Sequence, residues 1–211
     1  MDVYKVLEGK PKFEKYKSVE HIISKLTLSG SDIYNTTDKI FKHYFGPDRE
    51  LGTDKFISLL HKDIGKGIIL FHRLFIKSSI GVSNLEDYFN HIIREEGLAD
   101  SEHYTGGDYM DKMVKLINYS MVIVEGQQNK GYPCKSTHYK PIRISNEVRS
   151  NCHHPLLQMF MYLNTAKIIF SDSHTTNKTE AQGFLVEAFM MWVKVALILG
   201  IDIETSIKEV I

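Results

Sequence analysis

Residues 126–145 combine positive charge with aromatic rings and contain no acidic residue. The cations are Lys130, Lys135, Lys140 and Arg143, and the rings between them are Tyr132, His138 and Tyr139. Lysine and arginine bind phosphate oxygens, and aromatic side chains stack on nucleobases. The segment therefore predicts a binding site for a polyanion such as a nucleotide, RNA or DNA. The alternative is a solvated loop that holds no ligand.

A second group of candidate residues lies in the segment Leu59-Leu60-His61-Lys62-Asp63-Ile64-Gly65-Lys66-Gly67. This segment resembles the signature of the HD-domain metal phosphohydrolases, in which an adjacent His-Asp pair after two leucines binds a divalent metal. The resemblance implies a metal site made of His21, His61, Asp63 and Asp100. Here Lys62 separates the histidine from the aspartate, so on a helix the two side chains point about 200° apart. They share an ion only at a helix end or bulge. Otherwise the segment marks the boundary between two helices.

Two segments near the C-terminus resemble the last core helix of the all-α nucleotide pyrophosphohydrolases of the MazG and dimeric dUTPase type. They are Leu185-Val186-Glu187-Ala188-Phe189 and Leu199-Gly200-Ile201-Asp202. The resemblance implies magnesium held by paired carboxylates against a triphosphate. Glu187 fits one ligand position, whereas Phe184 occupies the position of its acidic partner. The alternative is a buried helix that glycine ends.

Ten histidines are many for a chain of this length, but only His153 and His154 are adjacent, and no His-x3-His spacing occurs. A transition-metal site would have to combine histidines that are distant in the sequence. Arg149 and His154 have the spacing of the Arg-x4-His motif and so resemble the ribonucleases of the HEPN type. The sequence contains no phosphate-binding P-loop, Rossmann or serine-hydrolase motif.

The composition is that of a globular protein, with 211 residues, 43% of them hydrophobic and 25% charged, and a formal net charge of zero. This balance excludes an overall attraction to nucleic acid or anionic membranes, so such binding requires a local patch. Two cysteines, Cys134 and Cys152, without a CxxC pair, favour a reducing cytosol. The charged N-terminus does not resemble a signal peptide, so a cytoplasmic location is expected.

The spacing of apolar residues is mostly helical and predicts an all-α, single-domain bundle over residues 1–211. A division into 1–125 and 145–211 is also open. About eight or nine helices are expected, joined by one long irregular loop at 126–144 that is rich in glycine and proline. The expected helices cover residues 19–26, 33–45, 53–60, 68–76, 85–93, 108–124, 155–170, 180–199 and 203–210. Ser18, Ser83, Thr179 and Asp202 are expected to cap helices, Pro155 to begin one and Gly200 to end one.

The stretch from Glu180 to Leu199 is apolar on nearly all sides. Its most apolar part, Phe184 to Leu199, is 16 residues long and includes Glu187 and Lys194. This part is too short and too charged to span a membrane, which takes about 20 apolar residues. We therefore expect a buried C-terminal helix at the core or at a subunit interface, with Met159, Met161, Met190 and Met191 packed there.

Two classes of function follow from these patterns. The first is a non-catalytic helical module that binds a protein partner or a polyanion through residues 126–145. The second is a metal-dependent phosphohydrolase acting on a nucleotide, of the HD-like or all-α pyrophosphohydrolase-like type, with a divalent metal as cofactor. No membrane span is expected, and a homo-oligomer is compatible with the sequence.

Overall fold

The computed structural model describes residues 18–45, 53–80, 146–172 and 178–210, and in these ranges the chain is helical and contains no strand. Five helices are present: α2 (Val19–Phe45), α3 (Thr53–Lys77), α6 (Asn146–Ser171), α7 (Lys178–Ile198) and α8 (Ile203–Lys208). The all-α prediction is confirmed, but the expected eight or nine helices are not found. Part of that difference arises because two expected helices, 85–93 and 108–124, lie outside the described residues. The rest arises because α2 and α3 each replace two expected helices.

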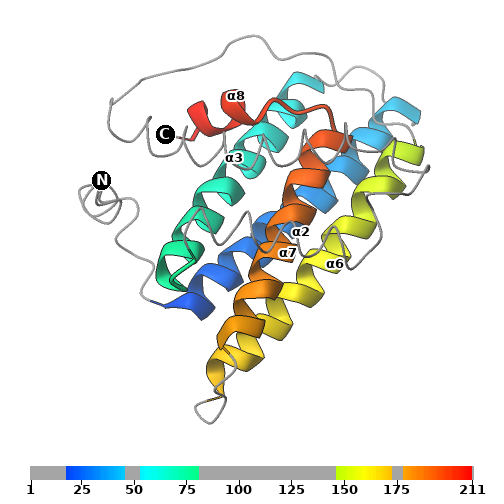
Figure 1. Cartoon of the computed structure of the whole chain (residues 1–211). Coiled ribbons are helices and arrows are strands. Elements are labelled where there is room, and N and C mark those ends of the chain that lie inside the picture. The colour runs from blue at the N-terminus through cyan, green and yellow to red at the C-terminus, as the bar shows by residue number, and fades with distance from the viewer. Residues whose placement is uncertain (1–17, 46–52, 81–145, 173–177, 211) are drawn as a thin grey trace, which may run out of the picture.

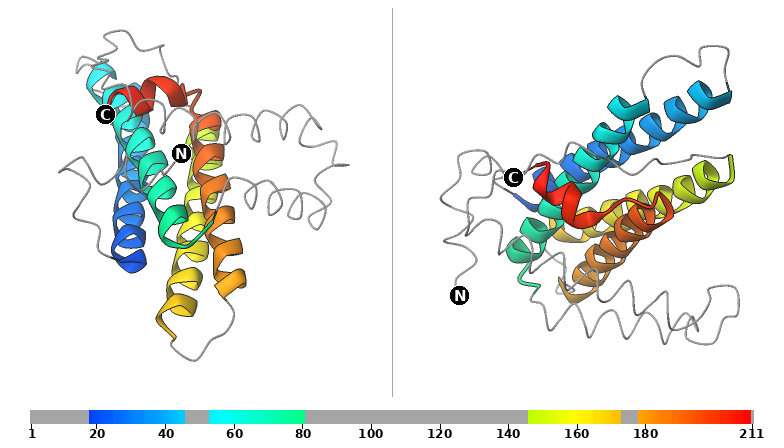
Figure 2. Two further views of the ribbon diagram at one scale, coloured as in Figure 1. Left: turned by 60° about the vertical axis from the view of Figure 1, so that its left-hand side comes forward. Right: turned by 90° about the horizontal axis from the view of Figure 1, so that it is seen from above.

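The four long helices form a closed bundle in which all packed neighbours run antiparallel (Figures 1 and 2). α2 packs against α3 and α6, α7 packs against α6 and α3, and the short α8 packs against α3. α3 ends at the opposite end of the bundle from the start of α6, so residues 81–145 connect the two ends (Figure 1). This topology joins the helix pair α2–α3 to the helix pair α6–α7.

Both α2 and α3 continue through glycines that lie between the helices expected on either side. α2 runs through Gly30, where an added Cβ would lie 2.7 Å from side-chain atoms of Met159 and Phe160 on α6. α3 runs through Gly65 and Gly67, so the expected boundary in this segment is wrong. Glycine costs a helix about 1 kcal/mol relative to alanine. Here the missing side chains let neighbouring helices approach closely, and this contact offsets that cost.

α6 begins nine residues before the expected start at Pro155, which lies inside the helix. Proline removes one hydrogen bond from a helix interior and often kinks it. The turns before Pro155 are held instead by contacts with α2, because Arg149 forms an ion pair with Asp38 and His153 lies 3.2 Å from the Thr37 hydroxyl. These tertiary contacts therefore outweigh the preference of proline for the first turn of a helix.

The predicted core helix is confirmed as α7, ten of whose residues are buried. Among the described helices, α7 alone has a length and apolar composition that would suit a membrane span, and over half of its most apolar window is buried in the bundle. Gly200, with φ of 65°, ends this helix as expected, and Ile201 N–H donates to the Ala196 carbonyl. Thr179, which was expected to cap this helix, lies inside it, because α7 begins at Lys178. The Gln182 side-chain N–H donates to the Ser78 carbonyl, just after the end of α3.

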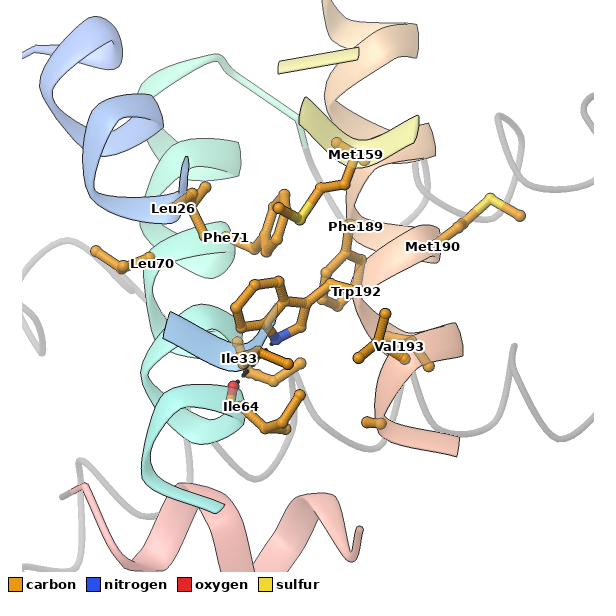
Figure 3. Packing of buried hydrophobic residues seen from close by; sticks show 14 of the residues in the cluster. Leu26, Ile33, Ile64, Leu70, Phe71, Met159, Phe189, Met190, Trp192 and Val193 are labelled. Carbon is orange, nitrogen blue, oxygen red and sulfur yellow. Dashed lines mark hydrogen bonds between the residues drawn. The ribbon is translucent and has the colours of Figure 1, made fainter. Parts of the chain in front are cut away.

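An aromatic cluster fills the contact between α3 and α7 (Figure 3). The ring of Phe71 lies 5.2 Å from that of Phe189 and 6.1 Å from that of Trp192. Trp192 is fully buried, and its Nε1–H donates to the Ile64 carbonyl at 3.1 Å (Figure 3). Met159 and Met190 are buried in the core as expected, whereas Met161 is exposed, so its predicted core position is wrong.

The expected N-termini of two helices, α2 and α8, are confirmed by their capping hydrogen bonds. The Ser18 hydroxyl accepts from His21 N–H at 3.2 Å and so caps the start of α2. The Asp202 carboxylate accepts from Thr205 N–H at 3.1 Å and caps α8. These caps are local in sequence, which is why the residue types alone indicate them.

Candidate functional site

His61 lies on the face of α3 that packs against α8. It is buried, and its Nδ1 lies 2.9 Å from the Ser206 hydroxyl. That hydroxyl donates its proton to the Asp202 carbonyl at 2.8 Å, so it accepts from His61 Nδ1–H. Burial lowers the pKa of His61, and the carboxylates of Asp202 and Glu209 only partly oppose this effect. His61 is therefore a neutral side chain that joins two helices.

Asp63 lies in a different environment, half-buried and near Asp32 of α2. The pKa of Asp63 is raised from 3.8 to about 6, mainly by burial and also by the charge of Asp32, while Lys66 opposes both effects. His61 is directed to α8 and Asp63 towards α2, in line with the 200° separation that Lys62 creates. The two side chains therefore do not converge on one ion.

The remaining members of the predicted metal site do not complete it. His21 is exposed in the first turns of α2, and Asp100 lies outside the described residues. Across the described ranges, no three histidine, cysteine, aspartate or glutamate side chains are placed to hold a metal ion. The metal-dependent phosphohydrolase stays a prediction that no geometry in this part of the chain favours.

The raised pKa of Asp63 predicts a pH-dependent stability. Its native pKa exceeds the unfolded value, so the native state loses stability as the pH rises from 3.8 to about 6, and the loss is complete above that range. We expect Asp63→Asn to increase the free energy of unfolding by about 1 kcal/mol at pH 8, after allowing for solvent screening of a partly exposed group. Urea unfolding at pH 4 and pH 8 measures this gain, which should be smaller at pH 4.

Two variants control this measurement. Asp32→Asn removes the neighbouring charge and should reduce the pH dependence, whereas Glu147→Gln removes an exposed carboxylate of α6. An equal gain for Asp63→Asn at both pH values would contradict the explanation by ionisation.

The residues implied by the pyrophosphohydrolase resemblance lie on α7. Glu187 is partly buried, and the ring of Phe184 stacks against that of Tyr162 of α6 at 6.1 Å between centroids. Phe184 thus packs two helices together at the position where the family has an acidic ligand. Gly200, with its positive φ, ends α7, and Asp202 caps α8, so this second segment is explained by the ends of two helices.

A cluster of polar and aromatic side chains joins α2 to α6 and was not predicted from the sequence. On α2 each member lies three or four residues from at least two others, so all of them share one face: Tyr34, Thr37, Asp38 and Phe41. On α6 its members are one turn apart: Arg149 and His153. We call these six residues the α2–α6 cluster.

The contacts of the α2–α6 cluster fix the orientation of its side chains. The Tyr34 and His153 rings stack with centroids 3.8 Å apart and planes 25° apart. Arg149 donates to Asp38 at 2.8 Å, and its guanidinium lies 4.1 Å above the centroid of the Phe41 ring. Lys42 forms a second ion pair with Asp38 at 2.7 Å. One carboxylate therefore links two cations.

The protonation of the α2–α6 cluster follows from the same contacts. The Thr37 hydroxyl donates to the Tyr34 carbonyl at 2.8 Å, so it accepts from His153 Nε2–H at 3.2 Å. Burial lowers the pKa of His153, as does Arg149. Hydrogen bonding from Lys42, and then from Arg149, lowers the pKa of Asp38 despite its desolvation. The cluster thus holds a neutral histidine, one carboxylate and, with Lys42, two cations.

The ribonuclease-like pair Arg149 and His154 does not share a face of α6. Five residues turn a helix through about 500°, so the two side chains point about 140° apart. His154 is exposed, and His153 is the histidine that lies on the face of Arg149. The structure therefore pairs Arg149 with a histidine one residue earlier than the motif requires.

The polyanion-binding residues predicted from the sequence lie outside the described residues. These are Lys130, Tyr132, Lys135, Tyr139, Lys140 and Arg143.

Cys152 of α6 is a free and fully buried thiol, and burial raises its pKa to about 12. Cys152 is thus a packing residue and not a nucleophile.

The sequence matches no family model, no curated protein and no solved structure.

Proposed function

We propose that this protein is a non-catalytic helical module that binds a polyanion with residues 126–145 and the adjoining end of the bundle. The main observation in support of this proposal is that the α2–α6 cluster lies at the start of α6, which directly follows residues 126–145 in the sequence. Arg149 of the cluster and the neighbouring Lys42 are both held in place by ion pairs with Asp38. Oriented cations beside a basic segment favour a ligand with repeated negative charges.

The charges near this end of the bundle support the proposal. Lys39 and Lys42 are exposed on the last turns of α2, and Arg149 is on the second turn of α6. Arg143 precedes α6 by three residues in the sequence and Lys140 by six. Asp38 and Glu147 offset part of this charge. A local excess of positive charge can bind phosphates although the whole chain has none.

The expected effect of removing the basic residues is a weaker and less salt-dependent binding. We expect the triple variant Lys135→Gln, Lys140→Gln and Arg143→Gln to bind a fluorescent 20-nucleotide oligonucleotide more weakly. Each lost phosphate contact lowers the slope of log affinity against log salt by about 0.7 for a single strand, so the slope should fall by about 2. Fluorescence anisotropy over a salt series measures both quantities.

A matched variant separates local from overall charge. Lys62→Gln, Lys77→Gln and Lys178→Gln remove the same number of charges from exposed positions on α3 and α7, away from the start of α6. We expect this control to bind as the wild type does. If both triple variants lose affinity equally, or if the wild type binds no polyanion at low salt, the proposed function is wrong.

A further inference from the structure

Tyr34 is the one exposed aromatic residue among the side chains that the structure describes. It is 38% exposed, whereas the other described aromatic rings are buried or partly buried. Large exposed rings cost hydration free energy, and aromatic residues are frequent at binding sites. The position of Tyr34 in the α2–α6 cluster, beside the cations of the proposed function, makes it a candidate contact for the ligand.

The Tyr34 ring is held in one orientation before any ligand binds. His153 stacks on it, and the Thr37 hydroxyl holds His153 in turn. Thr37 is itself fully buried and donates to the Tyr34 carbonyl. A ring fixed in this way loses little conformational entropy on binding, which favours affinity.

Two exposed apolar side chains follow the stacked pair along α6. Leu157 and Met161 follow His153 at intervals of four residues, so the three side chains lie along one face of α6. Leu157 is 55% exposed and Met161 is 67% exposed. Arg149 lies one turn before His153, about 6 Å along the helix axis. Cations at one side of a ring and apolar groups at the other match a nucleotide, which has a charged phosphate and a flat base.

We propose that Tyr34, stacked on His153, is a platform for an unpaired nucleobase, with Arg149 and Lys42 beside it for the phosphates. This inference rests on the proposed function and narrows its ligand to single-stranded nucleic acid. Stacking on aromatic rings is tolerant of sequence, because every base has a flat face. A peptide that docks on Leu157 and Met161 is the competing occupant, and it would need no base.

The test compares two ligands with the same backbone charge. One is a 20-nucleotide oligothymidylate and the other is an abasic oligonucleotide of the same length, both measured by fluorescence anisotropy. We expect the wild type to bind the oligothymidylate about tenfold more tightly. Tyr34→Ala should remove this difference by weakening only the base-containing ligand, and Tyr34→Phe should keep it.

A control variant and a fold check complete the experiment. Leu28→Ala removes another exposed apolar side chain of α2, which points about 120° away from Tyr34, and should change neither affinity. Circular dichroism establishes that each variant is folded, and the wild-type comparison of the two ligands needs no variant.

The outcomes separate the platform from the proposed function. Equal wild-type affinity for both ligands overturns the platform but leaves polyanion binding intact, as does an unchanged preference in a folded Tyr34→Ala variant. Absence of binding to either ligand overturns both. Weaker binding of both ligands by Tyr34→Ala shows that the residue supports the fold of the site and overturns the stacking role.

Discussion

Replacing Gly67 by alanine is expected to lower the free energy of unfolding by about 3 kcal/mol. The added Cβ would lie 1.9 Å from Cζ2 and 2.1 Å from Cε2 of the Trp192 indole. The indole is fully buried and bonded to the Ile64 carbonyl, so it cannot rotate away without losing that bond. Helix propensity alone predicts the opposite effect, an increase of about 1 kcal/mol in the free energy of unfolding. Urea unfolding therefore distinguishes close packing from propensity.

A double-mutant cycle attributes this loss to the indole. Trp192→Ala alone should cost about 3–5 kcal/mol because it leaves a cavity in the core. In that background Gly67→Ala should cost nothing further, because the atoms that it meets are absent. Lys66→Ala, at the position directly before Gly67 on α3, is the matched control and should change stability little. Additive losses in the cycle would contradict the contact.

Replacing Gly65 by alanine is expected to displace α8 and to cost a similar amount, about 3 kcal/mol. The added Cβ would lie 1.9 Å from the carbonyl oxygen and 2.4 Å from the carbonyl carbon of Ser206. These are backbone atoms, so no side-chain rotation relieves the overlap, and α8 must move as a unit. The movement breaks the bond between His61 and Ser206 and exposes the buried Ile207.

A shortened chain checks whether the cost arises at α8. In a variant that lacks residues 202–211, the atoms opposite Gly65 are absent, and Gly65→Ala should then no longer destabilise the bundle. The comparison uses thermal unfolding of four proteins, with and without the substitution and with and without these residues. An equal loss in the shortened chain would place the effect within α3 itself.

Much of the fold follows from local patterns in the sequence. The apolar spacing predicts helices in each described range, and short-range hydrogen bonds confirm the caps at Ser18 and Asp202. The expected gaps at residues 27–32 and 61–67, which contain Gly30, Gly65 and Gly67, are wrong for a common reason. Each glycine faces another helix closely, and the sequence does not indicate which residue will lie opposite. At these positions, contacts between helices outweigh the local tendency of glycine to interrupt a helix.

The α2–α6 cluster could not be predicted because its pairs are distant in the sequence. Thr37 and His153 are 116 residues apart, and Asp38 and Arg149 are 111 apart. The three- and four-residue spacing on α2 indicates a shared helix face, but it does not identify the partner helix. By contrast, the segment that resembles the HD signature is explained by packing. His61 bonds to α8, Leu60 and Ile64 are buried, and the two glycines admit α8 and Trp192.

The connection between opposite ends of the bundle has a consequence for the order of folding. α2 and α3 adjoin in the sequence across residues 46–52, and α6 and α7 across residues 172–177, so each antiparallel pair can form early. The contacts that unite the pairs, such as Trp192 with Ile64 across 128 residues, must wait for closure of a much longer loop. We expect two helical hairpins to appear first, and their docking to be the slow and cooperative step that creates the native state.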